Sequence, residues 1–202
     1  MIRSVYYNQT EIIASIMQLH HIDCFDADIT FGNGKFWDDL PMPKLKFDID
    51  PQIEGVQQAS SVDLPIESNS INSVMFDPPF LTYVRQGRNH NNGSMIMSSR
   101  FGGYWTYNEL ETHYTQTIKE SFRVLRKKGI LTIKCQDIVH NHKLHATHIN
   151  VVNWAHGFFR LKDLFILPAK NRMAIPQQKN TAKKKQRHAR IFHSYFMVLE
   201  RL

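Results

Sequence analysis

The sequence predicts a single α/β domain with a parallel sheet. Apolar segments of strand length alternate along the 202 residues with segments whose apolar residues recur at helical spacing. This alternation is typical of parallel strands joined by right-handed crossovers. The length is that of one domain, so we expect residues 1–202 to share one core.

The first half of the chain predicts one helix and three strands. Thr10 is a candidate N-cap for a helix over 10–19, in which Ile12, Ile13, Ile16 and Met17 share one face. The mixed segment 22–28 predicts a strand that ends in a glycine loop. A second strand is predicted over 44–49, where Asp50-Pro51 stops it. The mostly apolar segment 71–76 is typical of a buried parallel strand.

The second half begins with a long loop and continues with two helices and three strands. Residues 81–106 are rich in Gly, Asn, Ser and Arg, which predicts a mobile substrate loop. A helix is predicted over 108–126, with Lys127, Lys128 and Gly129 ending it as cations and glycine commonly do. The remaining predictions are strands over 129–135, 158–167 and 191–199, and a helix over 145–156.

The positive charge is concentrated in one segment. The chain has 25 Lys+Arg and 18 Asp+Glu, a net charge of +7. Residues 170–190 contain eight cations and no acid, and they account for the whole excess: Lys170, Arg172, Lys179, Lys183, Lys184, Lys185, Arg187 and Arg190. We therefore expect residues 168–190 to be a basic insertion between the last two strands that contacts a polyanion.

Composition excludes several other classes of protein. No apolar segment approaches the ~18 residues that span a bilayer, and residues 1–11 lack the pattern of a signal peptide. Cys24 and Cys135 are too few and too far apart for a disulfide framework or a zinc site. A cytoplasmic protein, in a bacterial or phage-infected host cell, is the expectation.

Two motifs in the first half point to a nucleoside ligand. In Asp28-Ile29-Thr30-Phe31-Gly32-Asn33-Gly34, an acid at a strand end precedes two glycines that let the backbone approach a ligand. Asp48 and Asp50 follow Asp28 by about twenty positions, the spacing at which an acid reaches ribose hydroxyls in doubly wound folds. The alternative is a tight turn followed by two solvated acids.

The most specific motif is Asp77-Pro78-Pro79-Phe80, directly after the apolar strand. The two prolines forbid a longer strand and stiffen the backbone, which fixes Asp77 at the carboxyl end of the strand. A carboxylate beside the free carbonyl of Pro78 suits an amino group with two N–H donors, and Phe80 can stack on a planar base. A purely structural turn is the alternative.

With these motifs the sequence resembles the class I S-adenosylmethionine-dependent methyltransferases that modify exocyclic amino groups of nucleic-acid bases, above all small phage-type DNA methyltransferases. Residues 77–80 match the D-P-P-[YF] signature, and residues 28–34 match the D-x-x-x-G-x-G loop, although Ile29-Thr30 stand where the family has P-F. The resemblance implies a Rossmann-like fold with a mostly parallel seven-stranded sheet, an antiparallel last strand, and helices on both faces.

The resemblance also implies a set of site residues. S-adenosylmethionine would be held by the glycine loop, by a ribose-binding acid at Asp48, and by an adenine-contacting acid at Asp63. The full expected cofactor set is Asp28, Thr30, Phe31, Gly32, Gly34, Asp48, Asp50 and Asp63. The expected catalytic set is Asp77, Pro78, Pro79 and Phe80, and the D-P-P-F form favours adenine N6 as the acceptor after base flipping.

Nucleic acid, with DNA favoured, is the expected partner. Cations interleaved with aromatic residues after Phe80 suit phosphates and unstacked bases, and the basic insertion suits the backbone. The expected contacts are Arg85, Arg88, Arg100, Lys183, Lys184, Lys185 and Arg187. Solvated surface loops are the alternative for both segments.

Other functions remain compatible with the sequence. RNA adenine and DNA cytosine N4 are alternative acceptors, and a catalytically silent nucleic-acid-binding subunit would keep the same fold. A nicotinamide-dependent enzyme is disfavoured because the third glycine of a dinucleotide fingerprint is missing. His142, His145 and His148 have the spacing of one helix face, for which a polar surface is favoured over a metal site.

Overall fold

A computed structural model describes residues 1–80, 106–169 and 187–202. Its main feature is a seven-stranded sheet in the order β3-β2-β1-β4-β5-β9-β8. The first five strands of this order pair in parallel, whereas β9 is antiparallel to both β5 and β8. The strands are β1 (Ala27–Asp28), β2 (Leu45–Asp48), β3 (Gln57–Gln58), β4 (Ile71–Phe76), β5 (Leu125–Cys135), β8 (Phe159–Pro168) and β9 (His193–Arg201). The mostly parallel sheet predicted from the sequence is confirmed.

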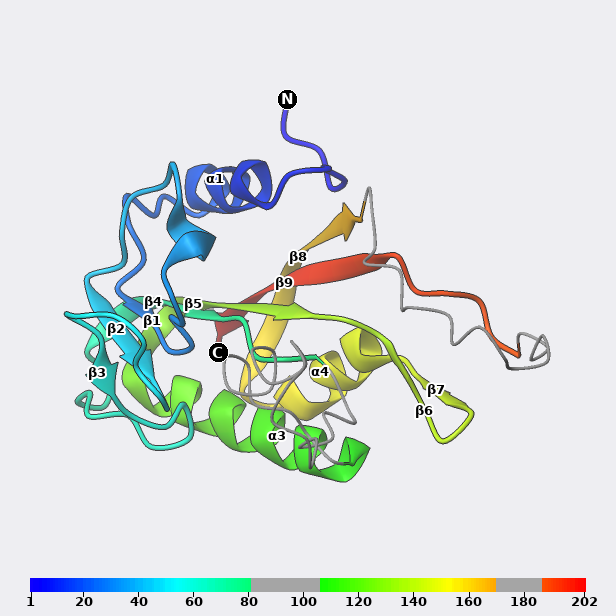
Figure 1. The fold of residues 1–202 in the computed structure, drawn as a ribbon. Coiled ribbons are helices and arrows are strands. Elements are labelled where there is room, and N and C mark those ends of the chain that lie inside the picture. Colours follow the sequence, from blue (N-terminus) through cyan, green and yellow to red (C-terminus); the bar gives the residue numbers. More distant parts are fainter. Residues whose placement is uncertain (81–105, 170–186) are drawn as a thin grey trace, which may run out of the picture.

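Helices cover both faces of this sheet (Figure 1). On one face lie α3 (Tyr107–Val124) and α4 (Thr147–Ala155), and on the other lie α1 (Gln9–Leu19) and the 3-10 turn η1 (Lys35–Trp37). Each face has its own apolar core, one including Ile118 of α3 and Val151 of α4, the other including Ile13 of α1. None of the described helices is long and apolar enough to span a membrane.

The ends of the first helices are set by side-chain caps. Asn8, not Thr10, is the N-cap of α1, because its Oδ1 accepts a hydrogen bond from the Thr10 N–H at 3.0 Å. Thr106 caps α3 in a reciprocal capping box with Glu109. The N-cap of α1 therefore lies two residues before the predicted one, and α3 begins one residue before its predicted start.

The boundary between α3 and β5 differs from the prediction. The helix ends at Val124, and Lys127, Lys128 and Gly129 lie within β5 instead of closing the helix. Leu125 pairs with Ile71, whereas the next paired residues are Ser73 and Ile130. The register therefore shifts, and β5 contains a bulge between these pairs. Gly129 fits this bulge because a Cβ there would lie 2.8 Å from the Arg126 carbonyl oxygen.

Two further predictions were wrong in detail. The strand predicted over 22–28 is reduced to β1, and the helix predicted over 145–156 begins at Thr147. His142 and His145 instead belong to a hairpin of β6 (Ile138–His140) and β7 (Lys143–His145), so they share no helix face with His148. Within the described residues, no group of three or more His, Cys, Asp or Glu side chains could hold a metal ion.

Candidate active site

Three predicted carboxylates lie at the same edge of the sheet. Asp28 is the last residue of β1, Asp48 is the last residue of β2, and Asp77 directly follows β4. Because β1 lies between β2 and β4 and all three are parallel, their carboxyl ends are neighbours. This is the edge at which open α/β sheets place their ligands.

Asp28 is a buried carboxyl group with two donors. Its Oδ1 accepts from the Thr30 N–H at 2.9 Å, and its Oδ2 accepts from the Trp37 indole N–H at 2.6 Å. Burial raises the pKa of Asp28 to about 7, and the negative charges of Asp77 and Asp48 act in the same direction. Burial and the two neighbouring negative charges therefore both favour the protonated form of Asp28.

Asp48 orders the glycine loop. Its Oδ2 accepts from the Gly32 N–H at 2.7 Å, and its Oδ1 accepts from the Asp50 N–H at 2.9 Å. Gly34 has a φ of +77°, which is strained for other residues, and a Cβ on it would lie 3.1 Å from the Phe31 ring, so this position strongly favours glycine. Phe31 is a core residue with 3% exposure, whereas the Asp50 side chain is exposed.

Asp77 is anchored through both its backbone and its side chain. Its N–H donates to the Thr30 Oγ at 2.8 Å, which ties the glycine-loop segment to the start of the Asp77-Pro78-Pro79-Phe80 motif. Its Oδ2 accepts from the Lys134 ammonium at 3.0 Å. Burial raises the pKa of the Asp77 carboxyl, and Lys134 partly offsets this rise. Phe80 lies over the same ammonium, with its ring centre 5.6 Å from Nζ.

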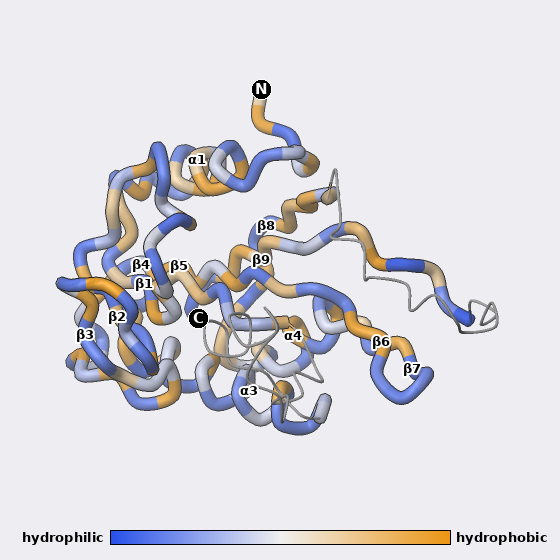
Figure 2. The backbone as a smooth tube through the Cα atoms, viewed as in Figure 1, coloured by the Kyte–Doolittle hydropathy of each residue, from blue (hydrophilic) through white to orange (hydrophobic). Residues whose placement is uncertain are grey.

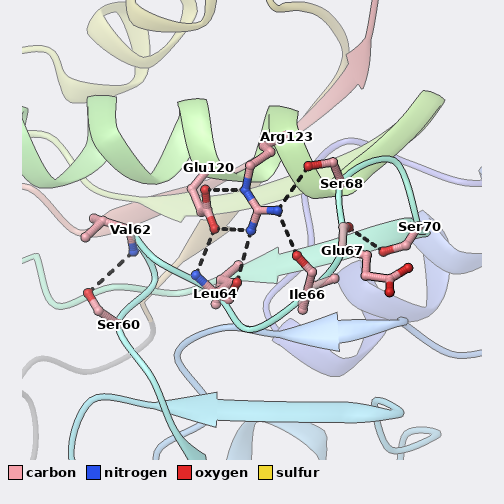
Figure 3. Close-up of polar contacts among 9 residues, drawn as sticks. All are labelled: Ser60, Val62, Leu64, Ile66, Glu67, Ser68, Ser70, Glu120 and Arg123. Carbon is pink, nitrogen blue, oxygen red and sulfur yellow. Dashed lines mark hydrogen bonds and ion pairs between the residues drawn. The ribbon is translucent and has the colours of Figure 1, made fainter.

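The loop that carries Asp63 is clamped to α3 (Figure 3). The Arg123 guanidinium donates to the carbonyl oxygens of Leu64 and Ile66 at 3.0 and 2.8 Å, and Glu120 accepts from the Leu64 N–H at 2.8 Å. The clamp fixes the segment that leads into β4. Asp63 itself is exposed, and its N–H donates to the Ser60 carbonyl oxygen.

The structure describes only one of the residues predicted to contact nucleic acid. Arg187 is described and exposed. The other predicted contacts lie outside the described residues: Arg85, Arg88, Arg100, Lys183, Lys184 and Lys185.

Sequence reasoning missed two residues of this site, Trp37 and Lys134. Trp37 lies nine residues from its partner Asp28 with no motif to connect them. Lys134 carried a signal, because it is a single cation between the apolar residues Ile133 and Cys135 of a buried strand. A charged residue at such a position needs a partner of opposite sign nearby.

Comparisons with known proteins identify a fold and no family. No family model matches the sequence, and no curated protein sequence matches it. Over part of its length the chain is similar to TTHA0409 from Thermus thermophilus, a provisional DNA modification methylase (16% identity, TM-score 0.43, 67% of this chain). This chain spans about half of that protein, 48% of its length.

Other solved structures match over most of the chain. The PH0226 protein of Pyrococcus horikoshii OT3 is 12% identical over 95% of this chain and 88% of that chain, with a TM-score of 0.54. An S-adenosylmethionine-dependent methyltransferase from Methanosarcina mazei is 11% identical over 91% of this chain and 97% of that chain, with a TM-score of 0.50. Together with the strand order, these matches show that the chain has the Rossmann-like fold of S-adenosylmethionine-dependent methyltransferases.

Proposed function

We propose that this protein transfers a methyl group from S-adenosylmethionine to the N6 amino group of adenine in DNA. The observation that carries the proposal is the placement of Asp77-Pro78-Pro79-Phe80 at the carboxyl end of β4. There the motif lies beside the glycine loop, and the Thr30 side chain binds the Asp77 backbone. A group that holds an amino acceptor and a loop that admits a nucleoside thus share one edge of the sheet.

The residues of this edge fit S-adenosylmethionine. The sulfonium and amino groups of the cofactor are cationic, and the edge presents the carboxyl groups of Asp28, Asp48 and Asp77. The negative charges of Asp77 and Asp48 raise the pKa of Asp28. We assign Asp48 to the ribose hydroxyls and the Gly32–Gly34 backbone to close approach of the ligand. When bound, S-adenosylmethionine supplies a methyl group whose bond to sulfur breaks with its electron pair left on sulfur.

The motif residues orient the acceptor base. The Asp77 carboxylate and the Pro78 carbonyl oxygen accept the two N–H bonds of the amino group, which turns the nitrogen lone pair toward the incoming methyl carbon. Phe80 stacks on the flipped base. The methylated nitrogen then releases one proton, for which the Asp77 carboxylate is a neighbouring acceptor. Positioning and electrostatic stabilisation supply most of the rate enhancement in such an arrangement.

A projecting arm supports nucleic acid as the partner. The β6–β7 hairpin and the segment before β9 extend together from the sheet (Figure 1), joined by a 2.8 Å hydrogen bond between the His188 ring and the His142 carbonyl oxygen. Hydrophilic residues prevail at the hairpin tip (Figure 2), and exposed cations include Lys143, Arg187 and Arg190. The segments 138–149 and 187–193 contain no acid. Such a surface suits phosphates.

Transfer of a labelled methyl group tests the proposal. The protein is incubated with S-adenosylmethionine and duplex DNA, single-stranded DNA or RNA of mixed sequence, and incorporation into each is measured. We expect incorporation into DNA by the wild-type protein and none by an Asp77→Ala variant. Absence of incorporation into any DNA would refute the proposal, and incorporation into RNA alone would assign the RNA enzyme instead.

A further inference from the structure

Lys134 is a nearly buried cation in contact with the proposed acceptor-binding carboxylate. Phe76 of β4 pairs with Ile133 of β5, so the next residues along the two strands, Asp77 and Lys134, are neighbours. The Lys134 Nζ lies 3.0 Å from Asp77 Oδ2 and 3.2 Å from Gln9 Oε1. The Lys134 side chain is 13% exposed. The Asp77 side chain is 21% exposed, so water has limited access to this ion pair.

Three aromatic rings surround the same ammonium. Their centres lie 5.1 Å from Nζ for Phe36 and 5.6 Å for both Phe80 and Phe196. These rings come from η1, from the Asp77-Pro78-Pro79-Phe80 motif, and from β9. Cation–π attraction of this kind is strongest where the cation is desolvated, so the rings hold Nζ in place. One ammonium therefore contacts both functional ends of the motif.

We propose that Lys134 is a positioning residue of the acceptor site, whose charge keeps the Asp77 carboxylate ionised and therefore able to accept hydrogen bonds from an amino group. The proposal rests on the proposed function. Lys134 acts through Asp77 and contacts no reacting atom.

The charges around Asp77 explain why such a residue is needed. Burial favours the protonated form of the Asp77 carboxyl and raises its pKa. Asp28 on β1 and Asp48 on β2 are the other acidic groups at this edge of the sheet. Gln9 of α1 is neutral. A protonated Asp77 would present a donor where the amino group also presents donors, so the two groups could not pair. Lys134 on β5 supplies the compensating positive charge.

The identity of the residue agrees with this role. A lysine in a buried strand is costly unless it is paired, and an apolar residue would satisfy packing on this face of the sheet at lower cost. Its neighbours Ile133 and Cys135 are both fully buried. The presence of a lysine at this position is therefore better explained by its interaction with the Asp77 carboxylate than by a contribution to the stability of the fold.

The test measures the pKa of Asp77 directly. In the intact chain with ¹³C-labelled aspartate, the carboxyl resonance missing from an Asp77→Asn sample identifies Asp77, and its titration is followed by NMR. We expect Lys134→Met, which keeps the length and removes the charge, to raise the pKa of Asp77 by about one unit or more. Lys134→Arg should retain the wild-type value within about half that shift.

The same change should appear in the pH profile of methyl transfer. Loss of activity at acid pH should begin at a higher pH in Lys134→Met, by the amount that NMR measures. The matched control is Lys44→Met. It removes the 2.7 Å ion pair between Lys44, just before β2, and Asp26, just before β1. It should leave both the pKa of Asp77 and the pH profile of methyl transfer unchanged. If Lys134→Met does not fold, Lys134→Gln removes the charge while keeping a donor, and the same shift is expected.

An unchanged Asp77 pKa in the charge-removing variants would overturn the proposal. This result differs from failure of the proposed function, which would appear as no methyl transfer to DNA by the wild-type protein. The NMR titration decides the role of Lys134 in either case.

Discussion

Asp28 couples the site to the stability of the protein. Burial raises its pKa to about 7 in the folded protein, against 3.8 for a free side chain. Between these values the folded protein binds more protons than the unfolded chain does, so the free energy of unfolding falls as pH rises from about 4 to about 7. Cofactor binding to this acidic edge should in turn favour the ionised form.

Replacement of Asp28 should remove this pH dependence. Asp28→Asn cannot titrate, and its amide oxygen can still accept from Thr30 or Trp37. We expect the wild-type free energy of unfolding, relative to the variant, to fall on the order of 3 kcal/mol between pH 4.5 and 7.5, as measured by urea unfolding. A constant difference across this range would contradict the assignment.

The wild-type protein must be compared with the variant because His113 changes the free energy of unfolding with pH in the opposite direction. Burial lowers the pKa of His113 to about 4 from 6.5. The folded protein therefore binds fewer protons at this ring between those values, and His113 makes stability rise with pH. His113 is present in both proteins, so its contribution cancels in the difference.

Replacement of Asp77 should abolish catalysis while leaving cofactor binding largely intact. The carboxylate serves the acceptor amino group, whereas the ribose is assigned to Asp48. We therefore expect Asp77→Ala to abolish methyl transfer and to change the dissociation constant of S-adenosylmethionine by less than about tenfold, measured by calorimetry. Asp23→Ala, at an exposed position, is the control and should retain both properties. Loss of cofactor binding by folded Asp77→Ala would contradict this division of roles.

At the scale of elements, the glycine loop is the part of the site that depends most on backbone shape. Gly34 has φ +77°, and its missing Cβ leaves space for the Phe31 ring. Gly34→Ala should lower stability by about 1 kcal/mol through its backbone alone and should also displace Phe31. We expect the affinity for S-adenosylmethionine, measured by calorimetry, to fall about tenfold or more.

Gly157 provides a matched control for this prediction. It has φ +83° and lies between α4 and β8, and a Cβ added to it would meet no atom within 4 Å. Gly157→Ala should therefore lower the melting temperature by a similar backbone effect and leave cofactor affinity unchanged. Equal loss of affinity in both variants would show that the effect is one of general stability.

The elements differ in how well the sequence predicted them. The strand β4 was predicted with its full bounds, because a short, mostly apolar segment that ends at two prolines has few other interpretations. The end of α3 was missed because Lys127, Lys128 and Gly129 form a typical helix end. This segment is part of a strand because β5 pairs with β4 from Leu125 onward. A pairing between residues so far apart in the sequence leaves no pattern in the local sequence.

The site shows the same limit. Asp28, Asp48 and Asp77 could be placed together because each lies at or next to the end of a predicted strand, and parallel strands end at one edge. Trp37 and Lys134 reach this edge through tertiary packing. Phe31, which the sequence predicts at the cofactor, belongs to the apolar core on the α1 side of the sheet.

At the scale of the whole molecule, the charge is divided between a nearly neutral body and one basic segment. Outside residues 170–190 the chain has 17 basic and 18 acidic residues. We expect the triple substitution of Lys183, Lys184 and Lys185 by Gln to weaken DNA binding. The dependence of the logarithm of affinity on the logarithm of salt should flatten by about 0.9 for each phosphate that the variant no longer neutralises.

The control uses lysines at the opposite edge of the sheet. Lys127 and Lys128 are exposed near the start of β5, and Asp77 contacts the other end of that strand. Their replacement by Gln should leave the salt dependence unchanged, while cofactor affinity should be unchanged in both variants. Equal flattening by both substitutions would indicate a general effect of net charge.

The central claim concerns one chemical group, the amino nitrogen that receives the methyl group. The most direct measurement is mass spectrometry of nucleosides from DNA incubated with the protein and S-adenosylmethionine, with Asp77→Ala as the comparison. The proposed function predicts N6-methyladenine with the wild-type protein and its absence with the variant. N4-methylcytosine in place of N6-methyladenine, or no methylated nucleoside at all, would contradict it.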